Sequence, residues 1–318
     1  MAVCLPAGIF SALLAIASGP LLRAEDDSME QVIVRVNDVA ITRKQVERVL
    51  RRVTKESPDE LDADLRKRLR RATAEEIVRK ELARQYLAES QWGATEAEIE
   101  PRVKRIAENL KERGITLAAH LKALGLTESS WRRQLHWRLA WKRYREHFVT
   151  DENLKKFFER HRRSYDGTRL RVAHLWLPLD TTRPPGGDRS SKDAAIARAK
   201  TILADIRSGK TTFEAAVRAY SKAPSAAAGG DIGWIERRAP MSEAFSAAAF
   251  KLDVGSVSDV VVTPRGLHLI RCLEEKPGKR TWRDAQTELR RDLERYLLDW
   301  LADQARKTAK VEWSSQHP

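Results

Sequence analysis

Apolar residues recur at helical spacing through much of the first half of the chain. Between residues 61 and 92 they fall every three or four positions, and Gly93 ends the pattern. A stripe with this period buries one face of a helix. Threonines and glycines between the stripes mark helix starts and ends. The pattern predicts helices after Thr42, at 61–92, from Thr95 to Gly114, at 116–124, at 127–148 and at 151–161.

Short strand-like segments are predicted near both ends of the chain. Gln31–Ala40 alternates apolar and polar residues on either side of Asn37–Asp38, which is a turn signal. Thr42 follows as a helix N-cap, with Gln45 three residues later as in a capping box. Lys310–Trp313 has strand character, and we expect it to pair with the first strand.

The second half of the chain mixes strand and helix patterns. Arg171–Leu177 and Thr263–Arg271 are strand-like runs, and each carries one histidine. A Pro- and Gly-rich insert at Thr181–Ser191 predicts a loop. Helices are predicted at Asp193–Ser208 and Thr212–Tyr220, the latter with Phe213, Ala216, Val217 and Tyr220 facing inward.

Three glycines in five positions stand between these two strands. Gly229 and Gly230 precede Asp231, and Gly233 follows. Such spacing predicts a tight turn, or a backbone that passes so close to another segment that a Cβ would clash. Ile232 and the residues after it begin a further strand-like run.

The last predicted helix, Trp282–Lys307, carries a stripe that needs a partner. Leu289, Leu293, Leu297 and Trp300 share one face of it. An apolar stripe is stable only when it is covered. We expect this helix to return to the N-terminal helical region and to complete it, which would make that domain discontinuous.

The composition of the chain limits the partners and cofactors that we expect. The 318 residues carry a net charge of +14, but the basic side chains alternate with acidic ones at helical spacing, so we expect no nucleic-acid partner. Only Cys4 and Cys272 are present, and no Cys–His cluster has metal-ligand spacing. Cys272 is expected to fill a small apolar space. We predict no cofactor and no metal.

Residues 1–24 contain an apolar run, Ile9–Leu22, that Gly19–Pro20 interrupts. It has the length of the hydrophobic region of a signal peptide and is short for a bilayer span. We expect export, with cleavage after Ala24. An uncleaved anchor is the alternative, and it would allow peripheral or anchored membrane association.

The order of these motifs resembles the parvulin-type (PpiC, rotamase) peptidyl-prolyl cis-trans isomerases. The resemblance covers about residues 168–275 and rests on a strand with His174, the Gly-Gly-Asp-Ile-Gly turn, Met241 and Phe245 in an M-x-x-x-F segment, and a strand with Gly-x-His at His268. Residues 250–258 look like the family's F-x-L-x-x-G-x-x-S turn. The turn before Thr42 is similar to the start of the helical domain in SurA-, PrsA- and PpiD-like chaperones.

The resemblance implies a site. Its catalytic residues would be His174, His268, Thr263 and Ser221, and its proline pocket would be formed by Ile232, Met241 and Phe245. The family places Asp or Cys two residues after the serine that matches Ser221, whereas this chain has Ala223. Activity is therefore expected to be weak, and Ala223 is expected at the hydrated rim of the pocket.

The implied protein is α+β and multidomain. We expect a signal peptide at 1–24, a mostly helical chaperone domain at 25–165, a parvulin domain with a small antiparallel sheet surrounded by helices at 168–275, and a completing helix and strand at 281–318. The implied function is that of an exported, periplasmic or cell-envelope foldase that acts on unfolded polypeptides containing X–Pro. The alternative is a parvulin-fold peptide clamp without catalysis. A hydrolase lacks a nucleophile–base set.

The tryptophans of the helical region leave two interpretations open. Trp131, Trp137 and Trp141 stand at helical spacing and either fill the core or contact unfolded clients. The spacing favours core filling for each of them.

Overall fold

The computed structural model describes residues 31–53, 63–178, 189–238, 240–263 and 265–314. The predicted signal segment and residues 181–188 of the predicted loop lie outside these ranges. The chain forms two compact units, one of Met1–Trp137 with Leu298–Pro318 and one of Arg138–Leu297. We call them the N/C unit and the central unit.

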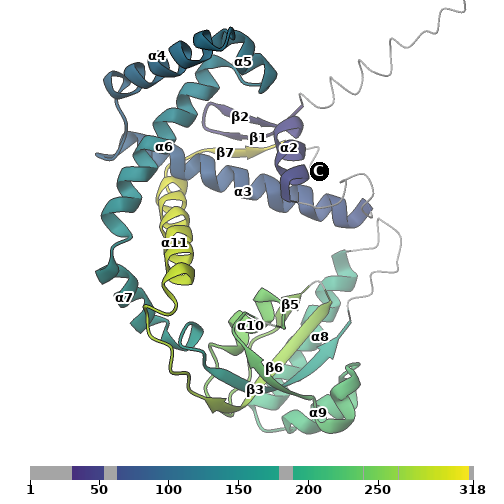
Figure 1. The fold of residues 1–318 in the computed structure, drawn as a ribbon. Helices are drawn as coiled ribbons and strands as arrows, with labels where there is room; N and C mark the ends of the chain where they lie inside the picture. The colour runs from purple at the N-terminus through teal and green to yellow at the C-terminus, as the bar shows by residue number, and fades with distance from the viewer. Residues whose placement is uncertain (1–30, 54–62, 179–188, 239, 264, 315–318) are drawn as a thin grey trace, which may run out of the picture. The chain divides into compact units, whose positions relative to one another are not determined.

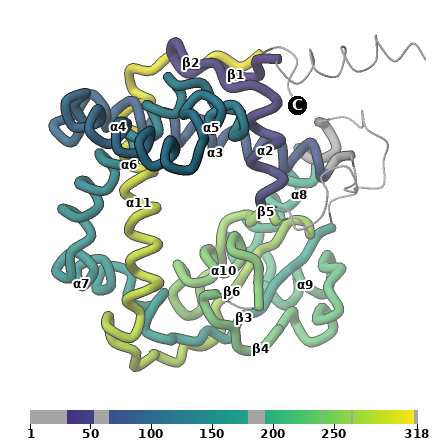
Figure 2. Tube along the Cα trace, turned by 45° about the horizontal axis from the view of Figure 1, so that its top comes forward, coloured from purple at the N-terminus to yellow at the C-terminus, as the bar shows by residue number. Residues whose placement is uncertain are grey.

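The N/C unit joins the two ends of the chain through a three-stranded antiparallel sheet. Its strands are β1 (Val32–Val36), β2 (Val39–Thr42) and β7 (Val311–Trp313), in the order β2-β1-β7. The predicted pairing of the C-terminal strand with β1 is confirmed, and Figure 2 shows the two segments side by side. Asn37 takes a left-handed φ of 52° in the turn. Its side-chain oxygen accepts the Lys310 amide at 2.8 Å, which ties the hairpin to β7.

Helices supply the rest of the N/C unit (Figure 1). They are α2 (Arg43–Val53), α3 (Ala63–Glu89), α4 (Glu96–Glu112), α5 (Leu117–Ala123), the first part of α6 (Glu128–Phe148) and the last part of α11 (Gln286–Arg306). The predicted helix start at Thr95 is confirmed, and the Thr95 amide donates to Glu98 at 2.9 Å in a capping box. Trp131 is 6% exposed, which confirms core filling for this residue.

The central unit is built around a four-stranded antiparallel sheet in the order β4-β3-β6-β5. The strands are β3 (Arg169–Leu177), β4 (Asp231–Glu236), β5 (Val261–Thr263) and β6 (Gly266–Lys276). The other elements are the remainder of α6, α7 (Asp151–Arg160), η2 (Arg162–Ser164), α8 (Arg189–Arg207), α9 (Phe213–Tyr220), η3 (Pro224–Ala228), α10 (Glu243–Ala249) and the first part of α11.

The two faces of this sheet bury different residues of the same strands. Ala173, Leu175 and Leu269 point to a core shared with α8 and α9. Val172 and Ile270, one position away on the same strands, point to a core shared with α10. In Figure 1, α10 lies on the opposite side of β3 and β6 from α8 and α9. Because side chains alternate along a strand, the second face also receives both histidines.

Several predicted element bounds change. The helix predicted from Asp193 begins at Arg189, so the end of the predicted loop is helical. The helix predicted from Trp282 begins at Gln286. A hydrogen-bonded turn precedes it, in which the Asp284 carboxylate accepts both the backbone N–H and the hydroxyl of Thr281, each at 2.7 Å.

Two side chains predicted to face inward are instead exposed. Tyr220 is 39% exposed and lies 5.7 Å from the Arg198 guanidinium. Trp300 is 40% exposed and meets the Tyr86 ring edge-on at 6.2 Å. The buried stripe of α11 continues through Leu301 in place of Trp300.

The division into units also cuts through two helices. Residues of α6 up to Trp137 and of α11 from Leu298 belong to the N/C unit, and the remainder of both belongs to the central unit. Leu289, Leu293 and Leu297 are buried and belong to the central unit. No helix in the described part of the chain combines the length and apolar character that a membrane span needs.

Candidate active site

The sheet register brings the two predicted histidines together. His174 on β3 is paired with Ile270 on β6, and His268 stands two residues before Ile270 on the same face. Diagonal neighbours of this kind lie within reach of ring side chains. The two Nδ1 atoms are 3.3 Å apart, and the rings stack at a centroid distance of 5.4 Å.

Thr263 extends this pair into a chain of hydrogen bonds. Its Oγ1 lies 3.0 Å from His268 Nε2, 3.2 Å from the Gly266 carbonyl, and accepts the Arg265 amide at 3.1 Å. The hydroxyl has a single hydrogen. If it is donated to Gly266, His268 Nε2–H donates to Thr263 and His268 Nδ1 accepts from His174. If it is donated instead to His268 Nε2, His268 Nδ1–H donates to His174 and the Gly266 carbonyl loses this donor. Thr263 therefore selects the tautomers of both rings.

Burial keeps both imidazoles neutral at physiological pH. His268 is 6% exposed, and burial, the neighbouring His174 and Arg265 lower its pKa to about 4. Burial also lowers the pKa of His174, which is half-buried. Desolvation disfavours the charged form of a base, and that is the first cause for both residues. In the described part of the chain His174 Nε2 has no hydrogen-bond partner, so it is the ring nitrogen open to another molecule.

Phe245 forms the apolar wall of the pair. It is 1% exposed and meets His174 and His268 edge-on at centroid distances of 5.8 and 5.4 Å. Ile232 and Met241 are partly buried and pack against the same cluster. The structure therefore brings together five of the seven predicted site residues: His174, His268, Phe245, Ile232 and Met241. Thr263 joins them as a sixth through its hydrogen bond to His268.

Gly230 explains why the glycine pair precedes this site. Its φ is +84°, and a Cβ there would lie 2.4 Å from the carbonyl oxygen of His174. The Gly230 carbonyl accepts the backbone N–H of His174 at 2.9 Å. The expected close approach is thus made to the backbone of a histidine of the site, and only glycine fits it.

The carboxylate after the glycine pair holds the turn rather than a substrate. Asp231 accepts the Gly233 amide at 2.8 Å and two nitrogens of the Arg171 guanidinium at 2.7 and 3.0 Å. These bonds offset the effect of burial and lower the pKa of Asp231. Asp231 is therefore ionised, and its oxygens are already hydrogen-bonded to Gly233 and Arg171.

Ser221 lies apart from the histidine chain in its hydrogen bonding. Its Oγ accepts the amides of Trp176 at 3.1 Å and Ala223 at 3.2 Å. The Lys222 amide returns a bond to the Trp176 carbonyl at 2.9 Å. These contacts fasten the segment after α9 to β3, which is a positioning role.

The prediction that Ala223 lies at the hydrated rim of the pocket is wrong. The residue is 6% exposed and begins the short helix η3. A carboxylate introduced there would lose much of its hydration. Ala223→Asp is for that reason a poor test of the missing Asp or Cys.

Two supporting residues were missed at the sequence level. Ser258, 5% exposed, accepts the amide of Ile270 through its hydroxyl at 3.0 Å and so completes the hydrogen bonding of β6 beside β5. Trp176 donates its indole N–H to the Arg265 carbonyl at 2.8 Å and holds the hairpin that carries Thr263. The F-x-L-x-x-G-x-x-S pattern contained Ser258 without revealing this bond.

Within the described ranges, no group of three or more His, Cys, Asp or Glu side chains is arranged to hold a metal ion. Cys272 is buried and unpaired, and burial raises the pKa of its thiol.

A sheet of four antiparallel strands with this histidine chain at its centre defines a parvulin-type domain. The family model of the PPIC-type PPIase domain, or rotamase, matches residues 175–274. The apple (Malus domestica) protein "Peptidyl-prolyl cis-trans isomerase Pin1" is 33% identical over 114 residues, which are 33% of this chain and 93% of that protein. The chain belongs to the parvulin-type peptidyl-prolyl isomerase family.

Two bacterial relatives extend the similarity beyond this domain. A "Chaperone SurA" of Aromatoleum aromaticum is 28% identical over 283 residues, which are 85% of this chain and 62% of that protein. The "Foldase protein PrsA" of Bacillus subtilis is 34% identical over 152 residues, 48% of this chain and 44% of that protein. The chain thus spans less than two thirds of the length of either relative.

Proposed function

We propose that this protein is a foldase: the central unit catalyses cis-trans isomerisation of X–Pro bonds, and the N/C unit holds unfolded polypeptides. The observation that carries the proposal is the neutral histidine pair, 3.3 Å apart, bonded to Thr263 and walled by Phe245. The names of the relatives, a chaperone and a foldase, support it.

The reaction needs no nucleophile. Rotation about a peptide bond is opposed by a barrier of about 18–20 kcal/mol because amide resonance is lost. The planar amide separates charge between oxygen and nitrogen, whereas the twisted amide does so less. An apolar site therefore favours the twisted form relative to the planar one, and that difference is catalysis.

Each part of the site has a role in that scheme. Phe245, Met241 and Ile232 would grip the proline ring through apolar contact. His268 and Thr263 would hold the His174 ring in one tautomer, so that its free Nε2 faces the peptide without adding a full charge. A charged imidazole would stabilise the planar, charge-separated amide and slow rotation.

The remaining features concern the setting of the reaction. The apolar segment before Glu25 supports export to the periplasm or cell envelope, and the family supports X–Pro peptides as substrates. We assign the discontinuous helical region, with its returning C-terminal strand, to the binding of clients. The pairing of β7 with β1 supports that assignment, because it makes the two chain ends one structural element.

A matched pair of substitutions tests the isomerase. Phe245 and Phe213 are buried to the same degree, 1% and 2% exposed, on opposite faces of the sheet. Phe245→Leu and Phe213→Leu should destabilise the fold similarly. In a protease-coupled assay with a proline peptide, we expect Phe245→Leu to lower kcat/KM at least tenfold and Phe213→Leu to change it less than twofold.

Equal effects of the two substitutions on kcat/KM would contradict the assigned proline pocket. A wild-type rate equal to the uncatalysed rate, with the peptide still bound, would leave the peptide clamp as the function. Suppression of aggregation of an unfolded client should survive both substitutions, because it is assigned to the N/C unit.

A further inference from the structure

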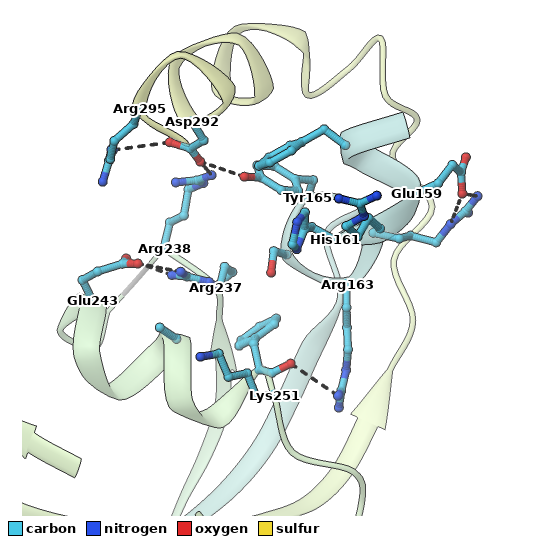
Figure 3. A pocket seen from close by; sticks show the side chains of 16 residues that line it. Glu159, His161, Arg163, Tyr165, Arg237, Arg238, Glu243, Lys251, Asp292 and Arg295 are labelled. Atoms are coloured by element: carbon cyan, nitrogen blue, oxygen red, sulfur yellow. Dashed lines mark hydrogen bonds and ion pairs between the residues drawn. The ribbon is translucent and has the colours of Figure 1, made fainter. Parts of the chain in front are cut away.

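A second concave site lies within the central unit, beside α10. It is a cavity of about 710 Å³ between α7, η2, the segment after β4, α10 and α11. Seven Arg and Lys side chains line it against three carboxylates. Figure 3 shows these side chains arranged around an open centre. The volume falls within the range of ligand pockets.

Each of the three carboxylates is already engaged by a cation. Glu243 receives two nitrogens of Arg237 at 2.5 and 2.9 Å, and Glu159 receives Arg162 at 2.7 Å. Asp292 accepts Arg238 at 2.7 Å and the Tyr165 hydroxyl at 2.9 Å. The pKa values of Glu243 and Asp292 are lowered by these partners, so both stay ionised and committed.

Some of the cations that line the cavity are not neutralised by these carboxylates. Within the described residues, neither Arg160 nor Lys251 has an ion-pair partner, and both are exposed. Arg295 is 61% exposed and shares Asp292 with other arginines at 3.4 Å. His161 adds no charge at neutral pH, because burial and Arg160 lower its pKa.

The floor of the cavity is rigid and partly apolar. Tyr165 is 6% exposed, and the Arg238 guanidinium lies over its ring at 5.3 Å. Phe250 is also 6% exposed. Phe157 and Ala247 also line the cavity and are partly exposed, so ligand side chains without charge would meet apolar surface between the cations.

This cavity is separate from the histidine pair. Glu243, Ala247 and Lys251 are spaced four residues apart and line the cavity. Phe245 and Ala249, also four apart, pack on the sheet core. The spacing puts these two sets on different faces of the segment, so α10 is a wall of both sites.

We propose that this cavity binds a carboxylate-rich segment of a polypeptide. Carboxylates satisfy the guanidinium and ammonium groups that lack partners, and charge-assisted hydrogen bonds of this kind are strong. A peptide whose acidic residues alternate with apolar ones matches both the cations and the aromatic floor.

Fluorescence anisotropy with a labelled proline-free peptide of alternating Glu and Ala tests the proposal on the full-length protein. We expect binding that weakens as salt rises, and at least tenfold weaker binding of the Gln–Ala peptide. The double variant Arg160→Glu, Lys251→Glu should weaken binding of the Glu–Ala peptide at least tenfold.

The matched control is Lys200→Glu with Arg218→Glu. These two cations are exposed, have no ion pair among the described residues, and change the net charge equally. We expect less than a twofold effect. Because the peptide has no proline, His268→Ala should leave its binding unchanged, so this test is independent of isomerase activity.

Three results would overturn the proposal. The first is that the Glu–Ala peptide does not bind. The second is that the control variant weakens binding as much as the cavity variant does, which would indicate only the overall charge of the protein. Binding of an oligothymidylate, lost in the cavity variant, without binding of the Glu–Ala peptide would assign the cavity to nucleic acid instead.

Discussion

The two sides of α10 face opposite kinds of chemistry. On one side Phe245 closes a dry site in which two histidines are neutral and bonded to each other. On the other side Glu243 belongs to a cavity in which most of the lining side chains are charged and exposed or partly exposed. A helix of seven residues is enough to separate them.

The difference shows how burial decides which groups carry charge. Burial, together with His174 and Arg265, lowers the pKa of His268 to about 4, so this ring is neutral. Asp292, although only 17% exposed, keeps its charge because Arg238 and the Tyr165 hydroxyl bond to it. The stability of the histidine site should therefore depend on packing, whereas ligand binding in the cavity should depend on charge and on salt concentration.

The largest expected effect comes from emptying the dry side of α10. Phe245→Ala should lower the free energy of unfolding of the central unit by about 3–5 kcal/mol, because it leaves a cavity in a closed core. Lys251→Ala, on the charged side, should change it by less than about 0.5 kcal/mol. Calorimetric unfolding of both variants checks the contrast. Similar losses for the two would show that the sides do not differ in packing.

Gly230→Ala should come next. A methyl group would strike the His174 carbonyl and the residue would keep a φ of +84°, so we expect a loss of about 3 kcal/mol. Gly209→Ala is the control, since it has a φ of +76° but nothing within 4 Å of the new Cβ. Urea unfolding should show a clearly smaller loss for Gly209→Ala; equal losses would rule out the close approach as the cause.

Acid should affect the histidine side before the carboxylate side. The folded pKa of His268, about 4, lies below its ordinary value near 6.5, so the unfolded chain takes up the proton first. Stability is fully present above pH 6.5 and falls as the pH drops toward 4, by about 2 kcal/mol between pH 7 and 5. His268→Gln should flatten this part of the stability profile. A wild-type profile that is flat from pH 7 to 5 would contradict a neutral buried His268.

The smallest effect concerns the floor of the cavity. Tyr165→Phe removes one of the hydrogen bonds to Asp292 but leaves Arg238 in place, so we expect a loss of about 1 kcal/mol. The pKa of Asp292 should rise, because that hydroxyl helps to lower it. NMR titration of the Asp292 carboxyl measures the shift, and an unchanged pKa would show that the bond is unimportant.

Much of the fold followed from local sequence pattern. Helical spacing, threonine caps and the glycine pair identified elements whose stability is set within a few residues, such as α4 with Thr95 and Glu98. Long-range contacts between separate strands were harder to anticipate. That His174 and His268 lie close together was predicted from the resemblance of the motifs. The local pattern could not predict it, because strand register is fixed by packing of the whole sheet.

The errors have physical causes as well. Ala223 was expected at the hydrated rim of the pocket, yet Ser221 bonds this segment to β3 and Ala223 is buried. Trp300 was placed in the stripe of α11 by spacing alone, whereas Leu301 fits that face better. The charged cavity beside α10 could not be inferred, since its residues come from five segments spread between Phe157 and Arg295.

The most direct test of the account is NMR exchange spectroscopy of an Ala-Pro peptide with a catalytic amount of the full-length protein at pH 7.5. Uncatalysed exchange takes tens to hundreds of seconds. We predict exchange on a timescale of seconds or less with the wild-type protein, and loss of most of the acceleration in His174→Ala. Exchange at the uncatalysed rate, while the peptide resonances show that it binds, would contradict the claim that the histidine site is an isomerase.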